Sequence, residues 1–129
     1  SMGVDGTVQD LRLLPPSYKA RFQAVITDPA ADEELAGEFL KAAVTCLAPG
    51  GWLFWADHPD WNQAALGLIE RAGQLGLELI EEQPNWHCYE PYVISDSTAQ
   101  HFHIPAEWFY ELVKHARVWS HLYILRRKP

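Results

Sequence analysis

Two compact apolar runs stand out along the chain, at residues 22–27 and 52–56, and each is followed directly by an aspartate. The first is rich in β-branched residues and the second in aromatic ones, which is the composition of buried strands. The first run stops at Asp28-Pro29 because proline biases the residue before it towards extended geometry. Both runs are therefore predicted to be strands of one buried sheet.

Apolar residues at helical spacing follow each of these predicted strands. The first stripe comprises Leu35, Phe39, Leu40, Ala43, Val44 and Leu47, and it begins after Asp32, with Glu33 and Glu34 favourably placed in the first turn. The second comprises Trp61, Ala65, Leu68, Ile69, Ala72 and Leu75, and it begins after Asp60, with Gln63 in the capping-box position. Each stripe predicts one face of an amphipathic helix.

The rest of the chain predicts a third strand at 77–82, a third helix that starts at Pro105, and a final strand at 118–125. Between them, residues 83–104 show no clear period, which is typical of a functional loop or of a segment that carries an extra strand. This order predicts an α/β layered sheet, largely parallel, with helices on both faces.

Composition places the chain among ordinary globular domains, with 48% hydrophobic and 21% charged residues. We expect one domain over 3–129, with Ser1-Met2 as a tag or start scar. The net charge of −7 disfavours broad nucleic-acid binding. The basic tail at 126–128 is either a small local patch or, more simply, a solvated chain end. No apolar run reaches the roughly 20 residues that cross a bilayer, and no signal peptide opens the chain, so a cytoplasmic location is expected.

Two cysteines are too few for a disulfide framework. Cys46 fits an apolar helical pattern as a small core residue. Cys88 follows His87, and two further imidazoles, His101 and His103, lie on one side of an extended segment. Their spacing matches no zinc pattern, and we expect no metal site.

The candidate chemistry lies where the first two strands end. In an open parallel sheet ligands bind outside the carboxyl ends of the strands, so Asp28 and Asp57 are predicted to face one crevice. A carboxylate there can accept a hydrogen bond from a substrate amine or act as a general base, and His58 can join Asp57 in acid–base chemistry. Alternatively, each aspartate caps the following helix or turn, and His58 is an ordinary turn histidine.

The long segment at 84–104 is rich in aromatic side chains, namely Trp86, Tyr89, Tyr92 and Phe102. Such rings can form the wall of a substrate pocket or a partner surface, or they can cover the edge of the sheet. The pattern leaves these readings open.

Two motifs together resemble a known family. Phe22-Gln-Ala-Val-Ile-Thr-Asp28-Pro29, and then Leu47-Ala-Pro-Gly-Gly51 before a strand, resemble the second half of class I (Rossmann-like) S-adenosylmethionine-dependent methyltransferases. In that family the fourth strand ends in an acidic residue, often within Asp-Pro-Pro, and a Leu-Lys-Pro-Gly-Gly turn introduces the fifth. More narrowly, residues 26–29, 77–90 and 119–126 are similar to branched-chain polyamine synthases, which transfer an aminopropyl group from decarboxylated S-adenosylmethionine.

The resemblance implies a partial three-layer sheet with the family's strand order four-five-seven-six and an antiparallel last strand. It also implies a transferase that moves a methyl or aminopropyl group from S-adenosylmethionine, or its decarboxylated form, to a small-molecule amine. Asp28 and Pro29 would touch the acceptor amine, Asp57 and His58 would line the same mouth, and Trp86, Tyr89, Tyr92 and Phe102 would contact the substrate.

The chain departs from the family in its donor site. The Gly-x-Gly-x-Gly turn is absent, as is the acidic end of the second strand, and Gln23, Ala30 and Ala31 replace the usual residues around Asp28. The donor is therefore expected to come from a missing half, on a longer chain or a second subunit. The fourth strand would then be an open edge, which natural proteins cover, so a homodimer is predicted. The alternative is a catalytically inactive interaction module that binds a protein or ligand through the aromatic loop 84–104.

Overall fold

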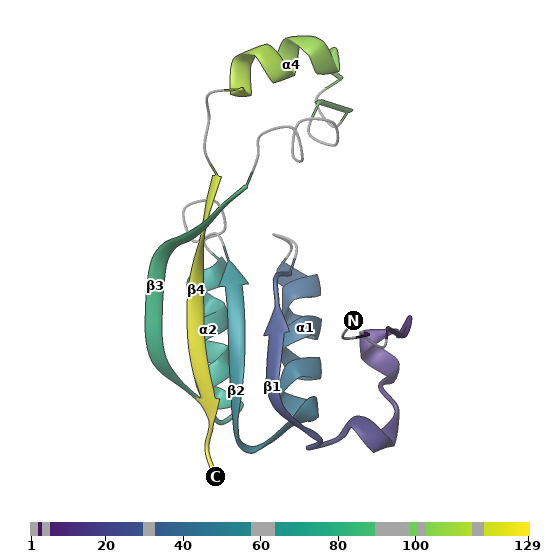
Figure 1. The fold of residues 1–129 in the computed structure, drawn as a ribbon, viewed down its shortest axis with the longest axis vertical. Coiled ribbons are helices and arrows are strands. Elements are labelled where there is room, and N and C mark those ends of the chain that lie inside the picture. Colours follow the sequence, from purple (N-terminus) through teal and green to yellow (C-terminus); the bar gives the residue numbers. More distant parts are fainter. Residues whose placement is uncertain are drawn as a thin grey trace.

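A mixed four-stranded sheet forms the centre of the computed structural model (Figure 1). The structure describes residues 3, 6–29, 33–57, 64–89, 99–100, 103–114 and 118–129. The strands are β1 (Phe22–Thr27), β2 (Leu47–Asp57), β3 (Leu77–Tyr89) and β4 (Val118–Arg127), in the spatial order β1-β2-β4-β3. β1 pairs parallel with β2, whereas β4 runs antiparallel to both β2 and β3. The predicted order and the antiparallel last strand are confirmed, and β1 lies at an edge.

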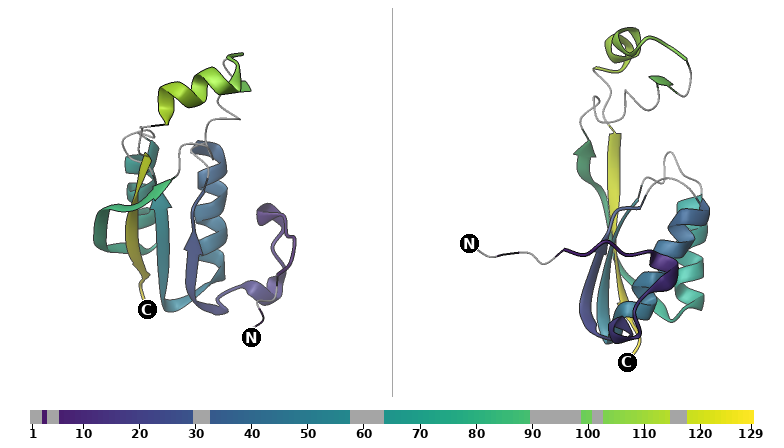
Figure 2. Two further views of the ribbon diagram at one scale, coloured as in Figure 1. Left: turned by 45° about the horizontal axis from the view of Figure 1, so that its top comes forward. Right: turned by 90° about the vertical axis from the view of Figure 1, so that its right-hand side faces the viewer.

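Two helices, α1 (Glu33–Cys46) and α2 (Ala64–Gln74), cover one face of this sheet (Figure 2). Helix α4 (Ala106–Val113), which begins after Pro105 as predicted, lies beyond the end of the strands (Figure 1). The expectation of helices on both faces is wrong for the helices described. Both crossovers advance in the same direction across the sheet, and crossovers of one hand then place their helices on the same side.

The core lies between this face and the two helices. Its members are buried side chains of α1, α2, β2, β3 and β4, namely Ala36, Leu40, Ala43, Leu47, Leu53, Trp55, Leu68, Ala72, Leu77, Tyr123 and Leu125. Burying one large aliphatic side chain contributes about 1.5–3 kcal/mol, so this cluster is the main source of stability. The predicted stripe of α1 is rotated slightly, because Leu35 is exposed and Ala36 is buried in its place.

Strand β3 extends further than the predicted 77–82. Its pairing with β4 slips between Gln83 and His87, which marks an irregularity of the β-bulge type. Pro84 lacks an N–H for the ladder, and Asn85 has a φ of 53°. The bulge breaks the two-residue alternation of side chains. The hydrophobic pattern therefore does not predict that the strand continues beyond residue 82. Residues 84–89 thus belong to β3 rather than to a loop.

The basic tail is part of the fold. The guanidinium of Arg126 lies 5.2 Å from the ring centre of Trp52, and that of Arg127 donates to the carbonyls of Val44 and Leu47. These contacts join the end of β4 to β2 and to the end of α1. The expectation of a solvated chain end is therefore wrong for Arg127, whereas Arg126 is exposed to solvent beside Trp52.

A short segment with two 3-10 helices, η1 (Leu11–Leu13) and η2 (Pro16–Tyr18), precedes β1. Asp10 begins η1 by accepting hydrogen bonds from the side chain and the backbone N–H of Arg12, and these bonds lower the pKa of its carboxyl. In the part of the chain that the structure describes, no helix combines the length and the apolar character that crossing a bilayer requires.

Candidate functional site

The carboxyl ends of β1, β2 and β3 lie along one border of the sheet, where β4 begins (Figure 1). We call this border the carboxyl edge, to distinguish it from the open edge along β1. Asp28 follows β1 directly, and Asp57 is the last residue of β2. Both aspartates are therefore at the edge where the sequence predicts them. This edge is also where open α/β sheets bind their ligands.

A pocket of about 310 Å³ lies at this edge and is lined by Ile26, Thr27, Asp28, Phe54, Ala56, Trp86, His87 and Leu122. We call it the edge pocket. Because Leu53 and Trp55 pack into the core beneath the helices, the alternation of side chains places Phe54 and Ala56 on the opposite face. The edge pocket thus opens on the face that α1 and α2 leave uncovered.

The bulge in β3 supplies one side of the edge pocket. After Asn85 turns the chain, Trp86 and His87 both line the cavity, and their ring centres are 5.8 Å apart with planes inclined by 48°. The Trp86 side chain is 52% exposed, so its indole face can still be covered by a ligand. Asp28 contributes a carboxylate to the same cavity. A carboxylate and an indole ring together suit a cationic nitrogen, which each of them attracts.

Asp57 has a different environment. Its carboxylate is buried, at 3% exposure, and its Oδ2 accepts a hydrogen bond of 3.0 Å from Nε1 of Trp55. Trp55 belongs to the core on the helix-covered face, and Asp57 does not line the edge pocket. The two aspartates thus share an edge of the sheet but not this cavity.

The structure describes the other predicted site residues only in part. Pro29 is buried directly after Asp28. Tyr89 is the last residue of β3, but its side chain is outside the description. His58, Tyr92 and Phe102 lie outside the described residues.

A polar row that the sequence did not reveal lies on the helix-covered face of the same edge. His121 of β4 is directly opposite Asp57 in the pairing with β2, and its Nδ1 lies 3.2 Å from Oε1 of Glu82 in β3. The ring of Tyr123 stacks on that of His121 at 6.4 Å and 28°. The row becomes visible only once the register of β4 between β2 and β3 is known, and the hydrophobic pattern does not contain that register.

Possible metal ligands do not gather in the described part of the chain. No group of three or more His, Cys, Asp and Glu residues there is arranged to hold a metal ion. His87 and Cys88 are consecutive on a strand, so their side chains point to opposite faces. His101 is outside the described residues.

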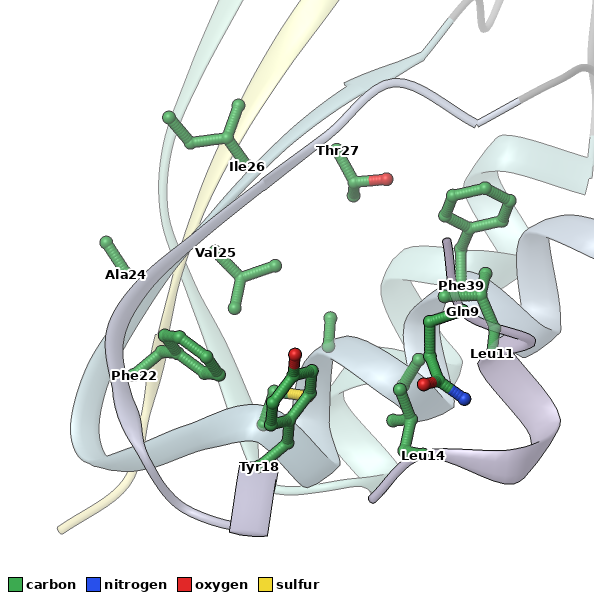
Figure 3. A pocket seen from close by; sticks show the side chains of 13 residues that line it. Gln9, Leu11, Leu14, Tyr18, Phe22, Ala24, Val25, Ile26, Thr27 and Phe39 are labelled. Atoms are coloured by element: carbon green, nitrogen blue, oxygen red, sulfur yellow. The ribbon is translucent and has the colours of Figure 1, made fainter. Parts of the chain in front are cut away.

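A second cavity of about 340 Å³ lies beside the open edge of β1, between that strand, α1 and the segment before β1 (Figure 3). We call it the edge groove. Val25 and Thr27 point from β1 into it (Figure 3). Its other walls are mostly apolar and include Phe39 and Cys46. Burial raises the pKa of the Cys46 thiol, so this group is a neutral part of the wall.

Comparisons with known proteins give matches only among solved structures. No protein-family model matches the chain, and no curated protein sequence does. A [4+2]-cyclase, SpnF, matches 95% of the chain and 55% of its own, at 17% identity and a TM-score of 0.57. A 16S ribosomal RNA adenine methyltransferase from Catenulisporales acidiphilia, with S-adenosylmethionine bound, covers 94% of the chain and 60% of its own, at 13% identity and a TM-score of 0.55.

A third structure, a putative sarcosine dimethylglycine methyltransferase from Galdieria sulphuraria, covers 93% of the chain and 57% of its own, at 13% identity and a TM-score of 0.52. The fold is that of Rossmann-like methyltransferases. The chain spans little more than half the length of these three structures. Their names lend no support to the narrower resemblance to polyamine synthases.

The methyltransferase fold implies S-adenosylmethionine as cofactor, and the described residues do not fit it. A glycine-rich turn at a carboxyl end would cradle the donor, but β1 leads into Asp28-Pro29. The described glycines with positive φ are Gly50, near the start of β2, and Gly76, directly before β3, and both lie at the opposite end of these strands. We therefore assign no described residue to the donor.

Proposed function

We propose that this chain is the acceptor side of a methyltransferase-like transferase and that it binds a small-molecule amine in the edge pocket. The observation that carries the proposal is the joint presence of Asp28 and Trp86 around one cavity at the carboxyl edge of this fold. Names of the structural neighbours favour a methyl group as the group transferred, with an aminopropyl group as the narrower alternative.

Different residues of the edge pocket bind different parts of the acceptor. The carboxylate of Asp28 accepts a hydrogen bond from the amine and orients its nitrogen, which is the main contribution that a protein makes to a displacement reaction. Trp86 covers the cationic or planar part of the acceptor. Phe54, Ala56 and Leu122 form an apolar floor against which the hydrocarbon part of the acceptor packs.

The donor, S-adenosylmethionine or its decarboxylated form, must be held by groups other than the described residues. We propose that a second copy of the chain joins this one through the open edge of β1. The sequence of β1, FQAVIT, contains no charged residue, so a twofold pairing of β1 with its copy brings no like charges together. The edge groove beside it offers apolar surface to the same partner.

The alternative function is a catalytically inactive module that binds a protein through exposed aromatic residues. Trp86 on β3 is 52% exposed, and on α4 Trp108 is 71% and Tyr110 43% exposed. One structural neighbour is named as a cyclase rather than a methyltransferase, so the fold alone does not decide the reaction. In this case Asp28→Asn would leave partner binding intact, whereas Trp108→Ala would weaken it.

Titration calorimetry tests the proposal with phenethylamine as the probe, because it joins an ammonium group to an aromatic ring. We expect saturable binding to the wild type and a loss of about 10- to 100-fold in affinity for Asp28→Asn, the cost of a charge-assisted hydrogen bond. Asp10→Asn is the matched control, since this aspartate is remote from the edge pocket and serves η1. A flat amine titration would contradict the proposal.

A further inference from the structure

The edge pocket has its acidic and its apolar groups on different sides. Asp28, which directly follows β1, is the only acidic residue among the described residues that line the cavity. Towards β2 and β4 the wall consists of the apolar side chains of Phe54, Ala56 and Leu122. A ligand whose nitrogen is held at Asp28 therefore extends over hydrocarbon.

The apolar side of the cavity is a continuous patch. Ala56 and Leu122 are directly opposite each other in the pairing of β2 with β4, and they are 5% and 8% exposed. Phe54, which is half-buried, is two residues before Ala56 on the same face. Transfer of a hydrocarbon group from water to this patch is favourable, whereas an ammonium group there would lose hydration and find no side-chain acceptor among these three residues.

The carboxylates of the neighbouring strands are not placed to receive a second ammonium group. Asp57 and Glu82 belong to the polar row on the opposite face. Glu81 on β3 is on the same face as the edge pocket, because it is opposite Ile124, which is itself opposite Phe54. Three strand spacings of about 4.8 Å separate β3 from β1, so the backbone of Glu81 is at least about 14 Å from the β1 side of the pocket.

We propose that the acceptor is a monoamine with an apolar tail and that the edge pocket discriminates against diamines and polyamines. The inference rests on the proposed function and deepens it, because it names the class of amine. The carboxylate of Asp28 pairs with one ammonium group, and the tail packs on the apolar patch beside the indole of Trp86. A cavity of about 310 Å³ is at the small end of ligand sites, which restricts the tail to a compact group.

Two probes of equal length test this inference, namely pentylamine and 1,4-diaminobutane. The diamine carries an ammonium group where pentylamine ends in a methyl group. Its two nitrogens are joined by five bonds of about 1.5 Å each, so it cannot extend from Asp28 to Glu81. In ¹H–¹⁵N titrations of the wild type at physiological ionic strength, we expect pentylamine to bind about 10-fold more tightly, although the net charge of −7 attracts the diamine more strongly.

Phe54→Glu supplies a second carboxylate on the apolar side of the pocket, and its side chain is half-buried in the wild type. This variant should remove or reverse the preference for pentylamine. Phe54→Gln is the matched control, because its side chain has the same length as glutamate but no charge. It should bind both probes more weakly and still prefer pentylamine. If Phe54→Gln loses the preference as well, the missing charge does not decide the selectivity and the inference is wrong.

The same titrations separate this inference from the proposed function. If 1,4-diaminobutane binds as tightly as pentylamine, and Asp28→Asn abolishes its binding, the class of acceptor is wrong and the binding site stands. If neither of these probes nor phenethylamine shifts the resonances of Asp28 and Trp86, the proposed function fails. The expected result is tighter binding of pentylamine to the wild type that is lost in Asp28→Asn.

Discussion

Trp55 and Asp57 form a buried polar pair at the end of β2, and each depends on the other. The indole donates its single N–H to Oδ2 of Asp57 at 3.0 Å, and both residues are at most 3% exposed. At this scale the two predicted aspartates differ. Asp57 is built into the fold, whereas Asp28 is exposed and lines a cavity.

Removing the indole donor should therefore destabilise the protein. Trp55→Phe leaves a buried carboxylate short of one hydrogen bond, which costs about 1–3 kcal/mol, in addition to the loss of ring volume. Trp52→Phe is the control, because that ring is partly exposed and contacts Arg126 instead. Urea unfolding should show the larger loss for Trp55→Phe, and equal losses would mean that the pair adds nothing.

Cys46 makes the free energy of unfolding depend on pH in the alkaline range. Its pKa is raised in the folded state by burial, whereas the unfolded thiol titrates near about 8.5. A raised pKa means that the folded state keeps its proton while the unfolded state loses it. The free energy of unfolding is therefore highest below the unfolded value and falls as the pH rises above it. Between pH 7.5 and 9.5 the wild type should lose more stability in urea unfolding than Cys46→Ala does, and equal losses would contradict this account.

At the scale of elements, the bulge of β3 positions the aromatic side of the edge pocket. Asn85 adopts a φ of 53°, which asparagine and glycine tolerate and β-branched residues do not. Asn85→Val should cost about 1–2 kcal/mol, and it should also displace Trp86 and His87. Asn85→Gly should preserve both the stability and the pocket. Urea unfolding together with the tryptophan fluorescence of the two variants measures this difference. If Asn85→Val left the free energy of unfolding unchanged, the backbone conformation of the bulge would not be constrained.

The elements differ in how far the sequence could predict them. Strand β1, helix α1 and the start of α4 follow from local signals, namely a β-branched run before Pro29, an apolar stripe and Pro105. The second half of β3 does not, because Pro84 and Asn85 interrupt the alternation on which a strand is recognised.

The pairing register of the strands is the feature that the sequence predicts least well. Asp28 was found because it directly follows a strand, and Trp86 because aromatic residues cluster around it. His121 and Glu82 come together only through the pairing of β4 with β2 and β3. No local feature of either strand predicts their contact.

For the whole molecule, the open edge of β1 and the edge groove beside it predict self-association. Among the described residues, β1 has a hydrogen-bonded neighbour only on its β2 side. Light scattering at tens of micromolar should give twice the 14.7 kDa of one chain. Ala24→Lys, which places like charges opposite each other across a twofold axis, should give monomers. Val8→Lys, at a fully exposed position outside β1, should not. A monomeric wild type would contradict the prediction.

We infer that the edge pocket binds an amine between Asp28 and Trp86. The most direct test is to map the amide and indole resonances of the wild type during a phenethylamine titration at neutral pH. We expect saturable shifts at Thr27, Asp28, Trp86 and His87, and their loss in Asp28→Asn. Saturable shifts confined to the edge groove or to α4, or shifts that persist unchanged in Asp28→Asn, would contradict it.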